Sequence, residues 1–120
     1  MLFSEDEFTL LKNTIVEAGK HILSYLDKKH LQIDFKSAVD LVTEADKFSE
    51  DFLCTRLIKH FPEDSILAEE GFSYTGTKGR WILDPLDGTT SFAHGFPFFA
   101  ISLAYERDNK VQVGMVYNPM

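Results

Sequence analysis

The opening stretch of the chain carries apolar residues at the spacing of one helix face. They recur every three or four positions, at Phe8, Leu11, Ile15, Ile22 and Leu26. Ahead of them, Ser4 and Glu7 have the spacing of a capping box, in which each side chain accepts the other residue's backbone N–H. The pattern predicts a helix over residues 5–29.

A second helix is predicted from Thr43, a candidate N-cap, to the residue before Pro62, which cannot continue a helix. Asp46 would then stand at the third helical position. A capping-box acid is the simpler interpretation of Asp46, and a role in chemistry is the alternative.

Between these helices, the alternation of apolar and polar residues over 31–35 predicts a short strand. Its hairpin partner is expected near residues 39–42, with Lys36 at the turn. Lys36 is open to two interpretations, a solvated turn lysine or a residue that reaches a site.

The second half of the chain has the pattern of strands. Residues 65–68 and 81–83 are short apolar runs, each followed directly by acids, and residues 72–79 have the composition of a surface loop. Residues 91–95 predict a short helix. Alternating residues over 98–106 and 111–117, around Asp108-Asn109, predict a hairpin. Two helices followed by a mostly antiparallel sheet indicate the α+β class.

Composition and charge narrow the function. The chain has 120 residues, 44% hydrophobic residues and a net charge of -7. This length suits one domain with a real core, and the acidic balance argues against a nucleic-acid partner. No run is long enough to span a membrane, the acidic start does not resemble a secretory signal, and the single Cys54 fits a reducing compartment. We therefore expect a cytoplasmic protein that does not bind membranes.

The chemistry is concentrated at the end of the strand over 81–83. Asp84 and Asp87 follow it, and Pro85 restricts the backbone so that two acids three residues apart can turn toward one point and share a hard cation. Gly88 lets the backbone approach a bound anion, ahead of the hydroxyls and amides of Thr89-Thr90.

Two other motifs are excluded. A helix-loop-helix calcium loop needs a glutamate at its twelfth position, where this chain has Phe96. Phosphatases with an aspartate nucleophile carry their acids two apart before Gly-Thr, and Pro85 occupies the nucleophile's position.

His94, among aromatic residues, is better explained as a structural or surface histidine than as a catalytic base.

The run WILDPLDGTTSFAHGFPFFAISLAY, with LAEEG and DLVTEAD upstream of it, resembles the inositol monophosphatase family of magnesium-dependent, lithium-sensitive phosphatases. The likeness covers about Lys36 to Pro119 closely. It implies a layered α/β sandwich of the sugar-phosphatase type, with both helices on one face of the sheet. It also implies hydrolysis of a phosphate monoester by a metal-activated water, with inositol monophosphate as the favoured substrate and fructose bisphosphate or adenosine bisphosphate as alternatives.

The resemblance also assigns roles. Magnesium would be held by Glu69, Asp84, the carbonyl of Leu86, and Asp87. Thr89 would orient and deprotonate the attacking water, Asp46 would accept the threonine's proton, and Glu70 would support the ligands. The residues that face the substrate would be Lys36, Glu69, Leu86, Asp87, Gly88, Thr89 and Thr90.

A family member's chain is about twice this long, and its second half carries a Trp-Asp motif that is absent here. We therefore interpret residues 1–120 as the N-terminal part of an inositol monophosphatase-like domain whose C-terminal half is needed to complete the site. Two other classes stay open: a non-catalytic metal-binding or interaction module, and a purely structural acidic domain. The family suggests a homodimer and a small phosphorylated polyol or sugar as substrate.

Overall fold

A computed structural model describes residues 3–29, 35–68 and 72–120 of the chain. The side chains of residues 26–29 and 35–41 are not described. The elements, in chain order, are helices α1 (Glu5–Lys29) and α2 (Phe35–His60), strands β1 (Ser65–Ala68), β2 (Ser73–Tyr74) and β3 (Arg80–Asp87), helix α3 (Thr89–Ala93), and strands β4 (Ala100–Arg107) and β5 (Lys110–Tyr117).

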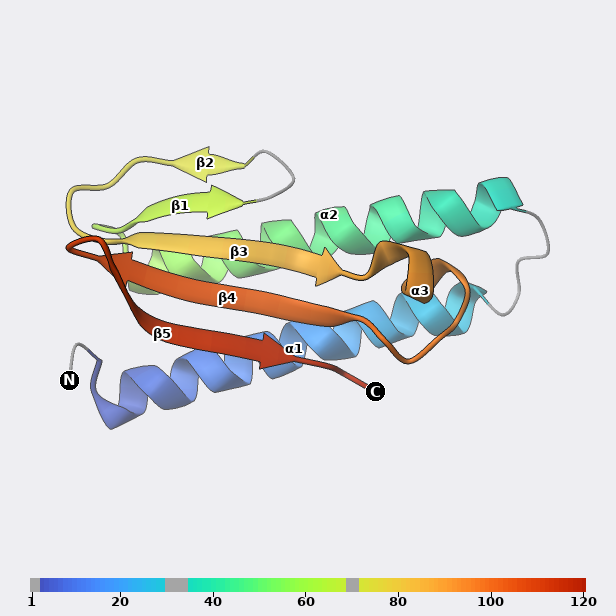
Figure 1. The fold of residues 1–120 in the computed structure, drawn as a ribbon, viewed down its shortest axis with the longest axis horizontal. Helices are drawn as coiled ribbons and strands as arrows, with labels where there is room; N and C mark the ends of the chain where they lie inside the picture. The colour runs from blue at the N-terminus through green and yellow to red at the C-terminus, as the bar shows by residue number, and fades with distance from the viewer. Residues whose placement is uncertain (1–2, 30–34, 69–71) are drawn as a thin grey trace.

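The strands form one sheet in the order β2-β1-β3-β4-β5, and α1 and α2 lie side by side across one face of it (Figure 1). The pairing of β1 with β3 is parallel, and the other three pairings are antiparallel. The α+β class, the mostly antiparallel sheet and the two helices on one face are thus confirmed.

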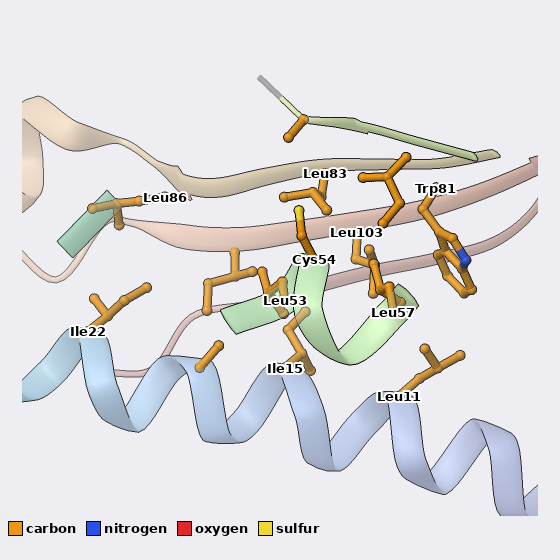
Figure 2. Packing of buried hydrophobic residues seen from close by; sticks show 14 of the residues in the cluster. Leu11, Ile15, Ile22, Leu53, Cys54, Leu57, Trp81, Leu83, Leu86 and Leu103 are labelled. Atoms are coloured by element: carbon orange, nitrogen blue, oxygen red, sulfur yellow. The ribbon is translucent and has the colours of Figure 1, made fainter. Parts of the chain in front are cut away.

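The first helix begins with the predicted capping box. The backbone N–H of Ser4 donates to Glu7 Oε1 at 2.9 Å, and the backbone N–H of Glu7 donates to Ser4 Oγ at 3.1 Å. The apolar face of α1 then packs against α2 and the sheet (Figure 2). Its buried positions follow the predicted spacing, with Leu11, Ile15, Ala18 and Ile22 each at most 4% exposed.

The second helix begins eight residues earlier than predicted. The expected hairpin strand at 39–42 is wrong, because α2 runs without interruption from Phe35. Residues 31–34, the rest of that hairpin, lie outside the described residues. The physical reason is visible in the sequence: Phe35, Val39 and Val42 also have the i, i+4, i+7 spacing of a helix face, and this period continues past position 43.

The early start of α2 corrects two further predictions. Thr43 cannot be the N-cap, because it lies in the helix interior, and Asp46 cannot be a capping-box acid for the same reason. The end of the helix is as predicted. It ends at His60, directly before Phe61-Pro62.

The strand region follows the prediction with shifted bounds and one addition. Strand β3 continues past residue 83 to Asp87, α3 covers Thr89–Ala93 rather than 91–95, and β4 starts at Ala100 rather than at 98. Ser73–Tyr74, expected to be part of a loop, pairs antiparallel with β1 as strand β2. The hairpin between β4 and β5 is confirmed, and its turn residues Asp108 and Asn109 have φ of 55° and 61°. Two consecutive positive φ values are the geometry of a type I′ turn, which suits the twist of the strands.

A buried aspartate fastens the end of the sheet that lies far from α3. Asp64 is 7% exposed, and its Oδ1 accepts the Tyr105 hydroxyl at 2.7 Å and the Gly79 amide at 2.9 Å. Burial of Tyr105 and its bond to Asp64 raise the tyrosine's pKa to about 12. This network joins the segment before β1, the segment before β3 and strand β4.

The sheet face opposite the helices is open. Leu67 and Val116 are 47% and 76% exposed there, and Ile82 and Ala104 are half-buried. Among the described helices, none is long and apolar enough to cross a membrane.

Candidate metal and phosphate site

The site begins where two neighbouring parallel strands end. β1 and β3 point toward the same edge of the sheet, next to α3 (Figure 1). Ala68, the residue before Glu69, is paired with Leu83, the residue before Asp84. Glu69 and Asp84 can share a metal only if these two strands are neighbours in the sheet, and the register meets this condition. Glu69 and Glu70 themselves lie outside the described residues.

A bulge at the end of β3 controls the directions of its two acids. Asp84 pairs with Ser102 and Asp87 with Ala100, so three steps along β3 match two steps along β4. In a regular strand, residues three apart point to opposite faces. The extra residue of the bulge restores one face for both acids, because Ser102 and Ala100 lie on the same face of β4. This arrangement is the turning that Pro85 led us to expect.

The acids differ in their surroundings. Asp84 is half-buried, and its Oδ1 accepts the backbone N–H of Leu86 at 3.2 Å. Asp87 is exposed. The side chain of Leu86 points into the core (Figure 2), which leaves its backbone for the site. Asp84 also lines a hollow of about 450 Å³ on the open face of the sheet, with Leu67 and Ser102.

These donors suit a hard divalent cation, because carboxylate and carbonyl oxygens are the ligands that Mg²⁺ prefers. The described side chains alone do not complete a site, since no three His, Cys, Asp or Glu among them gather as a metal-binding group. The residues therefore fit part of an oxygen site whose further ligands must come from elsewhere.

Gly88 joins β3 to α3 in a conformation that favours glycine. Its φ is 86°, in the left-handed region, and a Cβ placed on it would lie 2.7 Å from the carbonyl oxygen of Phe98. Gly88 is the N-cap of α3, and its carbonyl accepts the amide of Phe92 at 3.0 Å. The amides of Thr89 and Thr90 belong to the first turn of α3, where no intrahelical acceptor is available.

A cavity of about 620 Å³ lies between α2 and α3, and both Asp46 and Thr89 line it. Asp46 is 9% exposed, whereas Thr89 is half-buried. The structure therefore brings Asp46 and Thr89, the two residues expected to transfer the proton, to one cavity. Among the described residues of its wall, the acids Asp46, Glu50 and Asp51 outnumber the one cation, Lys47.

Two buried polar residues of α2 were missed from the sequence. Ser49 is 0% exposed, and its hydroxyl donates to the carbonyl of Pro85 at 2.8 Å. Glu50 is 6% exposed, and its Oε1 accepts the backbone N–H of Phe72 at 2.9 Å. The available signal was their position three and four residues after Asp46, on the face that continues with Leu53 and Leu57.

The remaining candidates are placed as follows. Lys36 lies in the first turn of α2, not in a strand turn, and its side chain is not described. His94 is exposed, and its Nδ1 donates to the carbonyl of Thr90 at 2.8 Å, which agrees with a structural role. Cys54 is buried among core residues (Figure 2), and burial, with the charges of Glu50 and Asp51, raises the pKa of its thiol to about 12. Such a thiol is inert at neutral pH.

Comparison of the sequence with known proteins gives a consistent result. Residues 4–120 match the sequence model of the inositol monophosphatase family. An inositol-1-monophosphatase of Rhizobium meliloti is 40% identical over 113 residues, 92% of this chain and 42% of the relative. The Nus factor SuhB of Vibrio cholerae is 41% identical over 107 residues, 87% of this chain and 40% of the relative. A histidinol-phosphatase of Chlorobaculum parvum is 36% identical over 104 residues, 86% of this chain and 40% of the relative.

Solved structures give the same picture. The extragenic suppressor protein SuhB of Bartonella henselae superposes with a TM-score of 0.81 at 32% identity, covering 96% of this chain and 44% of that chain. Inositol monophosphatase II of Staphylococcus aureus superposes with a TM-score of 0.80 at 31% identity, covering 96% and 42%. The chain thus spans about two-fifths of the length of the proteins it matches.

Proposed function

The chain belongs to the inositol monophosphatase family, and on that premise we propose that it supplies the N-terminal part of a magnesium-dependent phosphatase acting on a small phosphate monoester. The observation that carries this proposal is the bulge at the end of β3, which turns Asp84 and Asp87 to one face beside Gly88 and the cavity shared by Asp46 and Thr89. Inositol monophosphate is the favoured substrate, and fructose bisphosphate or adenosine bisphosphate are the alternatives.

In this proposal Glu69, Asp84, the carbonyl of Leu86, and Asp87 hold the magnesium ion. The pairing of Ala68 with Leu83 supports the participation of Glu69, because Glu69 follows Ala68 as Asp84 follows Leu83 in two adjacent parallel strands. Once bound, the ion supplies Lewis-acid polarisation of the phosphate and a lower pKa for water.

The chain's own residues would provide positioning and proton transfer. Thr89 orients the attacking water through its hydroxyl, and Asp46 takes the proton that the threonine releases. The amides of Gly88, Thr89 and Thr90 bind phosphate oxygens, and Gly88 allows this close approach because it has no side chain. We keep Glu70 as a residue that supports the ligands and Lys36 as one that reaches the substrate.

The test is phosphate release by the complete protein from inositol monophosphate, fructose bisphosphate, adenosine bisphosphate and histidinol phosphate, with and without magnesium and with added lithium. We expect magnesium-dependent release, strongest with inositol monophosphate and inhibited by lithium. Asp87→Asn should abolish it, because the change removes a ligand oxygen and a compensating charge. The matched control is Asp108→Asn, in the β4–β5 turn, which should leave release unchanged because asparagine tolerates a positive φ. Retention of most activity by Asp87→Asn would refute the assignment.

A second candidate is a non-catalytic metal-binding or interaction module. It is favoured by a relative that is named as a Nus factor. Magnesium binding without release of phosphate from any of the four substrates would support this alternative. The homodimer and the cytoplasmic location stay predictions, and native mass spectrometry tests the first of them.

A further inference from the structure

Three polar residues, Asp46, Ser49 and Glu50, occupy one face of α2 where apolar residues would be expected. They are 9%, 0% and 6% exposed and are followed on the same face by the buried Leu53 and Leu57. Burying a hydroxyl or a carboxylate lowers stability unless each finds partners, whereas an apolar side chain would pack there without that cost. The polar residues at these positions therefore need an explanation beyond packing.

The contact of Ser49 falls in the middle of the bulge. Residues 85 and 86 have no paired residue on β4, because the register goes from Asp84 directly to Asp87. The strand ladder therefore leaves this segment without its usual support. The hydroxyl of Ser49 donates to the carbonyl of Pro85 at 2.8 Å and ties the segment between the two acids to α2.

The contact of Glu50 holds the end of the neighbouring strand. Its Oε1 accepts the amide of Phe72 at 2.9 Å, while the carbonyl of Phe72 accepts the amide of Ala68 at 3.0 Å. Ala68 is the last residue of β1 and stands directly before Glu69. Glu50 thus fixes, through Phe72, the point at which the chain leaves β1.

We propose that Ser49 and Glu50 are positioning residues that hold the two acid-bearing strand ends against α2 and thereby set the affinity of the site for magnesium. The proposal rests on the proposed function. Its physical basis is that two separate segments are tied to adjacent residues of one rigid helix. Groups that orient metal ligands typically change metal affinity by about 10–100-fold when removed.

The experiment compares Glu50→Ala, Glu50→Gln and Ser49→Ala in the complete protein. Glutamine keeps an oxygen that can accept the Phe72 amide, so Glu50→Gln separates the hydrogen bond from simple loss of the side chain. The control is Glu44→Ala, which removes an exposed glutamate from the same helix. Magnesium affinity is measured by calorimetric titration, and magnesium dependence of phosphate release is measured separately.

We expect Glu50→Ala and Ser49→Ala to weaken magnesium binding by about tenfold or more. Glu50→Gln should restore most of the affinity and Glu44→Ala should equal the parent. At saturating magnesium, kcat should recover in both alanine variants. Phe72 amide hydrogen exchange in the parent provides a measurement that needs no variant, and we expect it to be slow and to slow further with magnesium.

Three results would overturn the inference. Folded Glu50→Ala and Ser49→Ala variants that titrate magnesium like the parent would show a merely structural role. Loss of affinity in Glu50→Gln equal to that in Glu50→Ala would show that the hydrogen bond to Phe72 is not the cause. Rapid exchange of the Phe72 amide, whether or not the variants fold, would also contradict it. A parent that neither binds magnesium nor releases phosphate would instead overturn the proposed function, and the inference with it.

Discussion

The turn at Gly88 offers the sharpest test of the site's geometry, through the substitution Gly88→Ala. An L-residue in the left-handed region costs about 1–2 kcal/mol relative to its normal conformation. The added Cβ would also lie 2.7 Å from the carbonyl oxygen of Phe98, a backbone atom two residues before β4 rather than the end of a flexible side chain. Forcing such an overlap costs about 1–3 kcal/mol.

One effect acts in the opposite direction. Alanine restricts the unfolded chain more than glycine does, which stabilises the folded state by about 0.4–1 kcal/mol. Together these terms predict a net loss of about 3 kcal/mol in the free energy of unfolding. Urea denaturation of the complete protein measures this loss as a shift in the transition midpoint with an unchanged slope.

The chain provides a matched control in Gly114→Ala. A Cβ added at Gly114 meets no atom within 4 Å, and its φ is not positive. We therefore expect a change within about 0.5 kcal/mol. If Gly88→Ala were no less stable than Gly114→Ala, the left-handed turn and the close approach of Phe98 would both be wrong. The Gly88→Ala variant should also release phosphate more slowly even where it is fully folded, because the amide of residue 88 would move.

Two further predictions concern the proton-transfer pair and the far end of the sheet. Thr89→Ala and Asp46→Asn should each lower kcat strongly. The double variant should be little slower than the worse single variant, because the effects of residues that act as a unit do not add. Additive losses of kcat in steady-state kinetics would contradict the pairing. Tyr105→Phe should destabilise the protein because it removes the bond to the buried Asp64. The folded pKa of Tyr105, about 12, lies above the ordinary tyrosine value of 10.0. The stability contributed by the bond is therefore fully present below pH 10 and is lost as the pH rises through 12. Urea denaturation at pH 8 and above pH 11 measures the free energy of unfolding of parent and variant. The difference between them should shrink with rising pH, and a constant difference would contradict this reasoning.

The sequence predicted most of the elements because their patterns are local. The capping box of Ser4 and Glu7, the helix over residues 5–29 and the hairpin around Asp108-Asn109 each depend on residues a few positions apart. The start of α2 was mistaken for a different reason. Residues 31–35 alternate as a strand does, and Phe35, Val39 and Val42 fit both a short strand pair and a helix face. Local pattern cannot decide between them, and the helix was favoured by its continuity with residues 43–60.

The candidate site was predictable only in part, for a related reason. Pro85 indicated that the strand would depart from regular alternation, but the bulge itself depends on the pairing of β3 with β4. The Glu50 contact was not predictable in this way, since it joins residues 22 apart in the chain. The spacing from Asp46 shows that Ser49 and Glu50 share its helix face. It does not show that Ser49 meets the carbonyl of Pro85 or that Glu50 meets the amide of Phe72.

The corrected extent of α2 changes how the site is understood. If the helix had begun at Thr43, Asp46 would lie in its first turn and would satisfy the helix's own amides. Because α2 begins at Phe35, Asp46 lies more than two turns inside, where the helix has no free amides for it to accept. One face of one continuous helix therefore presents Asp46 to the cavity with Thr89, Ser49 to the bulge and Glu50 to the end of β1. A displacement of α2 along its axis would move all three together relative to the sheet, so packing of Leu53 and Leu57 against the core also controls the alignment of the site.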